Sequence, residues 1–197
     1  MTSRPTGPPP VLNIANALTG IRLLLVPVFL AALLAEDGLD IGWRLTAFGV
    51  FALASFTDSL DGDIARRRGL VTAFGTIADP IADKALTGSA LIGLSALGFI
   101  PWWVTIVIMG RELGVTVLRL LVLRHGVIPA SRGGKAKTAL QILAIGLYLL
   151  PLPELLGPST TIDAVRAGAL AAAVLLTVVT GLDYVLRAAR LRAGSTP

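Results

Sequence analysis

The chain has 197 residues, of which 54% are hydrophobic and only 15% are charged, and its formal net charge is +5. A soluble domain carries about a quarter charged residues, so this composition argues against a soluble protein. The absence of cysteine excludes disulfides, thiolate metal sites and cysteine nucleophiles. The single histidine, His125, lies in a basic stretch, and we interpret it as an interfacial side chain.

Long apolar runs, such as LLLVPVFLAALLA at 23–35 and AGALAAAVLLTVV at 167–179, identify an integral membrane protein. The proline-rich start, residues 1–10, has no apolar periodicity, and we expect it to be disordered. Residues 11–190 are expected to form a single membrane domain, followed by a flexible tail at 191–197. The predicted fold is all-α and polytopic, with six transmembrane helices at 17–35, 44–66, 73–99, 102–123, 137–152 and 162–187.

The charges between these spans predict their orientation. The connections RRRG at 66–69 and RHGVIPASRGGKAK at 124–137 are basic, whereas the alternate connection EDGLD at 36–40 is acidic. Because basic connections stay on the cytoplasmic side, we expect a multi-pass protein of the cell membrane with both termini in the cytoplasm. The positive charge then indicates attraction to anionic membrane lipids and no nucleic-acid partner.

Four aspartates recur at helical spacing around the turn between the second and third predicted spans. Asp58 and Asp61 are three residues apart, and Asp79 and Asp83 are four apart, so each pair shares one helix face. Counted from the turn, Asp58 and Asp83 both lie roughly 13–16 Å into their helices, so the two pairs can face each other. Carboxylates at that depth are costly unless they are protonated, paired or metal-bound. Because carboxylate clusters suit Mg²⁺ or Mn²⁺, we predict a metal site in a polar cavity open to the cytoplasm.

At these positions the sequence resembles a known family. The pattern that carries the resemblance has eight typed positions over 26 residues: Asp58-x2-Asp61-Gly62-x2-Ala65-Arg66-x8-Gly75-x3-Asp79-x3-Asp83. It is the signature of the CDP-alcohol phosphatidyltransferases. The resemblance implies a six-helix membrane enzyme, commonly a homodimer, that uses two divalent ions. It also implies that all four aspartates bind the metals and that Asp83 serves as general base. The residues implied to bind CDP-diacylglycerol are Gly62, Ala65, Arg66 and Gly75.

Three further stretches are similar to the phosphatidylglycerophosphate synthase branch of this family: NIANALTGIRLLLVPVF at 13–29, GREL at 110–113 and SRGGKAKTALQ at 131–141. That branch transfers the phosphatidyl group of CDP-diacylglycerol to glycerol 3-phosphate and releases CMP. An anionic acceptor needs cations near the site, and the candidates are Arg111, Arg132, Lys135 and Lys137. We expect the side chain of Arg111 to have its role in the polar cavity. Pairing with Glu112 is hindered, because sequence neighbours point to different helix faces.

Two alternatives remain open. The same chemistry could use another acceptor, namely inositol phosphate, serine or phosphatidylglycerol. A protein of another class, a divalent-cation transporter, also carries acids within its spans. A transporter predicts acids distributed along a route across the membrane, whereas the four aspartates gather near one side. The transporter hypothesis also gives no function to Ala65, Arg66 and Gly75.

Overall fold

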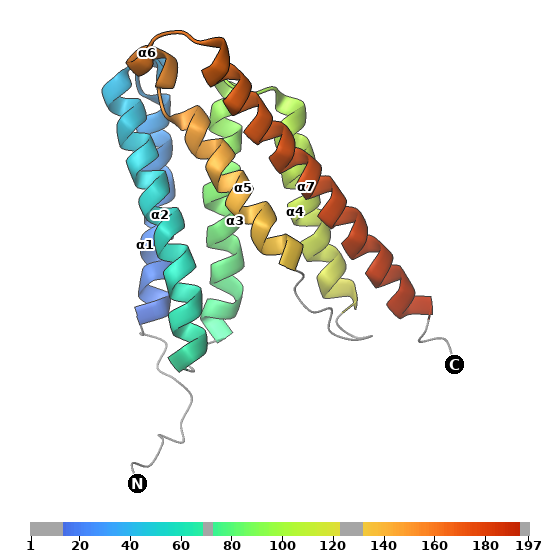
Figure 1. Cartoon of the computed structure of the whole chain (residues 1–197). Coiled ribbons are helices and arrows are strands. Elements are labelled where there is room, and N and C mark those ends of the chain that lie inside the picture. The colour runs from blue at the N-terminus through green and yellow to red at the C-terminus, as the bar shows by residue number, and fades with distance from the viewer. Residues whose placement is uncertain (1–13, 69–72, 123–131, 194–197) are drawn as a thin grey trace. The chain divides into compact units, whose positions relative to one another are not determined.

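Every described element of the chain is helical (Figure 1). The computed structural model describes the backbone of residues 14–68, 73–122 and 132–193, and the side chains of residues 19–57, 81–82, 84–118 and 134–190. The elements are α1 (Ile14–Leu34), η1 (Ala35–Gly38), α2 (Ile41–Arg68), α3 (Ala73–Ala96), α4 (Trp102–Val122), α5 (Arg132–Leu149), α6 (Leu152–Leu156) and α7 (Thr160–Ala193). The predicted all-α fold is confirmed for these residues.

Each predicted span falls on one of the long helices, with shifted ends. Helix α2 begins at Ile41 instead of residue 44, because the carboxylate of Asp40 accepts a hydrogen bond from the backbone N–H of Trp43 at 2.8 Å. The structure also contains η1 and the short α6, which the sequence analysis did not predict. Within the described residues, two stretches are long and apolar enough to cross a membrane, Thr19–Gly38 and Thr160–Arg190.

The chain divides into two compact units, Met1–Ser89 and Ala90–Pro197. The first unit contains α1, η1, α2 and most of α3. The second contains the end of α3 together with α4, α5, α6 and α7. The aspartate motif therefore belongs to the first unit, whereas all four candidate acceptor-binding cations belong to the second.

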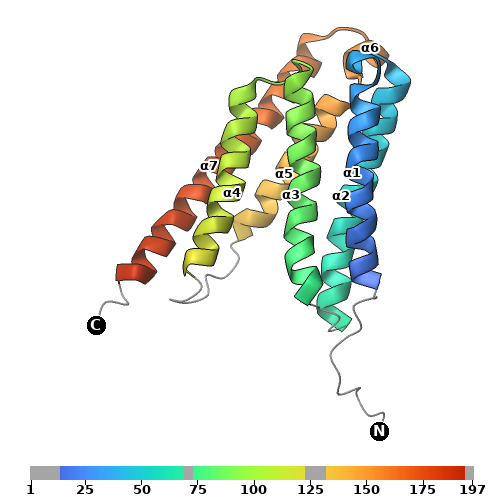
Figure 2. The same ribbon diagram turned by 180° about the vertical axis from the view of Figure 1, so that it is seen from behind.

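Helices α1 and α2 form an antiparallel hairpin in the first unit and pack side by side (Figures 1 and 2). In the connection, Glu36, Asp37 and Gly38 have φ angles of 49°, 54° and 71°, and this left-handed backbone reverses the chain direction. Behind the turn, the buried rings of Phe29 and Phe51 have centroids 5.9 Å apart. The hairpin thus fixes the direction of α2, the helix that carries the first aspartate pair.

In the second unit, the end of α3 is joined to α4 by a glycine cap. Gly98 has a φ of 75°; its N–H donates to the carbonyl of Ser95 at 3.1 Å, and the N–H of Phe99 donates to that of Leu94 at 2.9 Å. This is the hydrogen-bond pattern of a Schellman motif, which closes a helix C-terminus. The hydroxyls of Ser95 and Thr105 lie 2.8 Å apart and connect the two helices behind the turn.

Helix α7 packs against both α4 and α5 in the second unit (Figures 1 and 2). The buried residues on these three helices include Val104, Ile108, Ala144, Ile145, Ala173 and Thr177. Large apolar side chains are exposed elsewhere on the same helices, among them Ile106, Leu143, Leu175 and Leu182. Such extensive exposed apolar surface is typical of helices that face lipid.

Candidate active site

The aspartates predicted to bind metal lie on two consecutive helices of the first unit. Asp58 and Asp61 are in α2, and Asp79 and Asp83 are in α3. The backbone therefore confirms that both pairs are in helices, where their spacing places each pair on one face. Their side chains lie outside the described residues, so the metal geometry remains a prediction.

The predicted CDP-diacylglycerol residues follow the same distribution. Gly62, Ala65 and Arg66 are in α2, and Gly75 is in α3. They lie within a few residues of the aspartates in each helix, and their side chains are likewise outside the described residues. The helical backbone thus carries the whole signature on two helices of one unit.

The donor chemistry of the aspartates fits a hard divalent cation. Four carboxylates supply only oxygen ligands, which suit Mg²⁺ and Mn²⁺ better than softer metals. Among the residues whose side chains are described, no group of three or more His, Asp or Glu residues could hold a metal ion. The signature aspartates lie outside those residues, and their role as metal ligands remains a prediction from the sequence.

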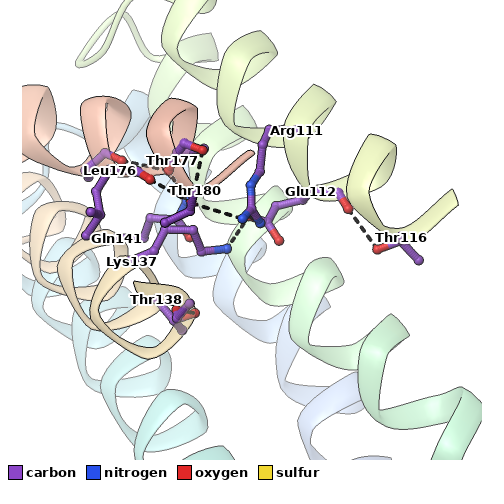
Figure 3. Close-up of polar contacts among 11 residues, drawn as sticks. Arg111, Glu112, Thr116, Lys137, Thr138, Gln141, Leu176, Thr177 and Thr180 are labelled. Atoms are coloured by element: carbon purple, nitrogen blue, oxygen red, sulfur yellow. Dashed lines mark hydrogen bonds and ion pairs between the residues drawn. The ribbon is translucent and has the colours of Figure 1, made fainter. Parts of the chain in front are cut away.

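The second unit contains a partly buried polar cluster formed by Arg111 and Glu112 of α4, Lys137 of α5 and Thr180 of α7, here called the α4–α5–α7 cluster (Figure 3). The ammonium group of Lys137 donates to Oε1 of Glu112. The guanidinium of Arg111 donates from Nη1 to the same carboxylate oxygen at 3.2 Å. Its Nη2 donates to the hydroxyl of Thr180 at 3.0 Å.

The contact between Arg111 and Glu112 corrects one expectation from the sequence. Neighbouring residues on a helix point about 100° apart, yet these two form an ion pair at 3.2 Å. Two long side chains can span that angle, and Lys137 of α5 anchors the carboxylate of Glu112 in the same place. The expected hindrance was therefore wrong, and Glu112 is a shared partner of two cations.

The cluster carries more positive than negative charge. Two cations, Arg111 and Lys137, share the single carboxylate of Glu112, and all three side chains are largely buried, with exposed fractions of 16%, 6% and 15%. Buried charges are stable when they are paired and hydrogen-bonded.

The remaining acceptor candidates have different positions. Lys135 is exposed, and because it lies two residues from Lys137 on α5, it points to another face of that helix. Arg132 is the first residue of α5, and its side chain lies outside the described residues. Of the four predicted cations, the structure therefore brings together Arg111 and Lys137.

Sequence reasoning missed the polar groups that surround these cations. The amide of Gln141 donates to the hydroxyl of Thr177 at 2.8 Å, one helical turn from Thr180 along α7. The signal was present, since Thr177 and Thr180 are spaced i, i+3 in the otherwise apolar run LLTVVTG. Hydropathy alone indicates only a lipid-spanning segment for that run.

Comparison with known proteins identifies the family. The family model described as CDP-alcohol phosphatidyltransferase matches residues 12–179. The chain belongs to the CDP-alcohol phosphatidyltransferase family. The predicted family is thereby confirmed: the protein is a phosphatidyltransferase, and family membership together with its apolar helices makes it a membrane protein.

Several relatives are similar to this transferase over most of its length. A Mycobacterium tuberculosis (strain H37Rv) protein named "Probable phosphatidylglycerophosphate synthase" is 56% identical over 180 residues, which cover 91% of this chain and 83% of the relative. The Bacillus subtilis (strain 168) CDP-diacylglycerol–glycerol-3-phosphate 3-phosphatidyltransferase is 40% identical, with 87% and 93% of the two chains covered. A Streptomyces coelicolor cardiolipin synthase (CMP-forming) is 37% identical, with 71% and 66% covered.

Proposed function

We propose that this transferase moves the phosphatidyl group of CDP-diacylglycerol to glycerol 3-phosphate, giving phosphatidylglycerophosphate and CMP. The observation that carries the proposal is the similarity to two relatives, 56% and 40% identical, whose names state this synthase and this transfer. Both alignments cover at least 87% of this chain, so the similarity extends well beyond the short signature.

The α4–α5–α7 cluster supports an anionic acceptor. We assign the acceptor's phosphate to Arg111 and Lys137, because a guanidinium and an ammonium group both form charge-assisted hydrogen bonds to phosphate oxygens. Arg111 suits this role because a guanidinium has five donors, of which two are used by Glu112 and Thr180 in the described contacts. Arg132 and Lys135 complete the proposed set of acceptor-binding cations.

The aspartates of the first unit are assigned to the chemistry. Asp58, Asp61, Asp79 and Asp83 would hold two Mg²⁺ or Mn²⁺ ions, and Gly62, Ala65, Arg66 and Gly75 would bind CDP-diacylglycerol. These aspartates would thereby supply, through the ions they hold, positive charge that stabilises a pyrophosphate and a departing CMP. Asp83 accepts the proton of the acceptor hydroxyl as its oxygen attacks the phosphorus attached to diacylglycerol. The bond from that phosphorus to the CMP oxygen breaks, and CMP leaves.

The membrane arrangement belongs to the same proposal. Residues 11–190 would form one membrane domain with six transmembrane helices, a polar cavity facing the cytoplasm, and both termini on that side. Residues 1–10 and 191–197 would be flexible, and the enzyme would act as a homodimer. The basic connections next to the aspartate motif and before α5 support this orientation.

A second acceptor has a specific observation in its favour. The similarity to a cardiolipin synthase makes phosphatidylglycerol the alternative acceptor with most support. We favour glycerol 3-phosphate, because the relatives whose names refer to that reaction are aligned over a larger share of this chain. A cation transporter has no support from the family.

The test is CMP release by purified protein in detergent with CDP-diacylglycerol and Mg²⁺. Glycerol 3-phosphate, inositol 1-phosphate, serine and phosphatidylglycerol are compared as acceptors, and Asp83→Asn serves as the variant. We expect release that requires glycerol 3-phosphate and falls about 10²–10⁴-fold in Asp83→Asn, the usual size of a general-base contribution.

Other results would separate the alternatives. Release that requires phosphatidylglycerol instead would keep the family and overturn the acceptor. Full activity in Asp83→Asn would overturn the assigned base. Metal flux into liposomes by folded protein that releases no CMP would favour a transporter.

A further inference from the structure

The position of Arg111 depends on the surface of α7 as well as on its polar partners. Its Nη1 is held by Glu112 and its Nη2 by the hydroxyl of Thr180, at 3.2 and 3.0 Å. Between these contacts and the backbone of α4, the aliphatic part of Arg111 crosses α7 at Gly181. A Cβ atom added to Gly181 would lie 2.9 Å from Cγ and 3.5 Å from Nε of Arg111.

A contact of 2.9 Å is closer than real Cβ atoms come to other heavy atoms. The clashing atom is Cγ, which lies near the backbone of Arg111, so rotation at the far end of the side chain cannot relieve the clash. The far end is in addition fixed by Glu112 and Thr180. A residue larger than glycine at 181 would therefore require a shift at this contact, and because the clash is at Cγ, a shift of Arg111 would carry its guanidinium with it.

The hydroxyl of Thr180 provides the second constraint. It lies 2.7 Å from the carbonyl of Leu176, to which it donates, so its oxygen lone pairs are turned away from its own helix. The same oxygen accepts the Nη2–H of Arg111. Thr180 thus orients the guanidinium plane, while Gly181 leaves the space that the side chain crosses.

We infer that Gly181 and Thr180 are positioning residues for the acceptor: they hold Arg111 where its free N–H groups can bind the phosphate of a phosphomonoester. This inference rests on the proposed function, which assigns that phosphate to Arg111. It adds two residues of α7, far from the aspartate signature in sequence, to the determinants of acceptor binding.

The test measures KM for glycerol 3-phosphate and for CDP-diacylglycerol in Gly181→Ala. Gly168→Ala is the matched control, because Gly168 lies on the same helix and nothing is within 4 Å of its added Cβ. We expect Gly181→Ala to raise the KM for glycerol 3-phosphate about 10- to 100-fold, the scale of a lost hydrogen bond to a charged group. The KM for CDP-diacylglycerol should change in neither variant.

Double variants distinguish positioning from a general packing defect. In an Arg111→Ala background, Gly181→Ala should have little further effect on the acceptor KM, since the side chain that it displaces is gone. A packing defect would add to the effect of Arg111→Ala.

Substitutions at Thr180 give a second route that leaves Gly181 intact. Thr180→Val, which removes the hydroxyl at constant shape, should raise the acceptor KM, and Thr180→Ser, which keeps the hydroxyl, should restore it. Thr46→Val is the control, because the hydroxyl of Thr46 bonds only a carbonyl of its own helix in the described contacts.

Three outcomes would overturn the inference, and they differ from failure of the proposed function. If Arg111→Ala raises the acceptor KM but neither Gly181→Ala nor Thr180→Val does, the positioning role alone is refuted. If Arg111→Ala has no effect on that KM, the assigned role of Arg111 and the inference fall together. An equal rise in the KM for glycerol 3-phosphate and in the KM for CDP-diacylglycerol would indicate a packing defect. Wild-type protein that releases no CMP with glycerol 3-phosphate would instead refute the proposed function.

Discussion

Removing the carboxylate of Glu112 should destabilise the protein strongly, because two largely buried cations would lose their shared partner. The side chains of Lys137 and Glu112 are only 6% and 15% exposed. Breaking a buried pair by deleting one partner costs about 3–5 kcal/mol. At about 2–4 °C per kcal/mol for a chain of this size, Glu112→Ala should lower the melting temperature by about 6–20 °C.

The assay is thermal unfolding of purified protein in detergent, followed by circular dichroism. Asp183→Ala is the matched control, because the ion pair between Asp183 and Arg187 lies in the same unit but is 46% and 49% exposed. An exposed pair at i, i+4 contributes about 0.5 kcal/mol or less, so this control should melt within about 2 °C of the wild type. Equal melting temperatures for Glu112→Ala and Asp183→Ala would refute the reasoning.

A compensating substitution tests the cause of that effect. In Glu112→Leu/Lys137→Met both charges are replaced by apolar side chains of similar length, and such replacements of buried pairs are often neutral for stability. The double variant should therefore recover part of the stability lost in Glu112→Ala, because Lys137 no longer carries a charge, whereas Arg111 still lacks its carboxylate partner. It should not recover activity with glycerol 3-phosphate, since Lys137 is one of the proposed phosphate-binding cations. Recovery of both stability and activity with glycerol 3-phosphate would argue against a role of Lys137 in the reaction.

Two further predictions concern the metals and the turn before α4. Chelation with EDTA should abolish CMP release, and added Mg²⁺ or Mn²⁺ should restore it. The added ion should also raise the melting temperature of the wild type but not that of Asp58→Asn/Asp61→Asn. CMP release that survives exhaustive chelation would contradict the metal assignment. Gly98→Ala should lower the melting temperature by about 2–8 °C, since a left-handed backbone costs a residue with a Cβ about 1–2 kcal/mol. Its activity below the melting transition should be unchanged, and Gly168→Ala, at a helical position, should show no such loss of stability.

The sequence predicted the long helices well because their signal is local. Apolar runs of membrane length, together with the turn residues between them, locate the ends of a helix to within a few residues. The deviations occur where a single side chain or a backbone conformation decides the boundary. Asp40 starts α2 earlier than hydropathy indicates, and the left-handed residues Glu36 and Asp37 belong to a turn that hydropathy does not register.

The site was predictable in part for a similar reason. The aspartate motif has fixed spacing within 26 residues, so its residues could be found and placed on helices from sequence alone. The partners of Arg111 could not, because Lys137 and Thr180 come from other helices and reach it only after packing. The ion pair between Arg111 and Glu112 could not be predicted from helix faces either, because Lys137 of α5 also binds the Glu112 carboxylate.

The threonines of α7 have a consequence for the assembly of the protein in the membrane. The hydroxyls of Thr177 and Thr180 each lie 2.7 Å from a carbonyl four residues earlier in the same helix, Ala173 and Leu176. Each hydroxyl proton is thus satisfied within α7, which carries no unpaired hydroxyl donor at these positions even when isolated in lipid. Helix α7 can therefore enter the bilayer before it meets α4 and α5. The hydroxyl oxygens of Thr177 and Thr180 can still accept hydrogen bonds. When α7 packs against α4 and α5, Gln141 donates to Thr177 and Arg111 donates to Thr180.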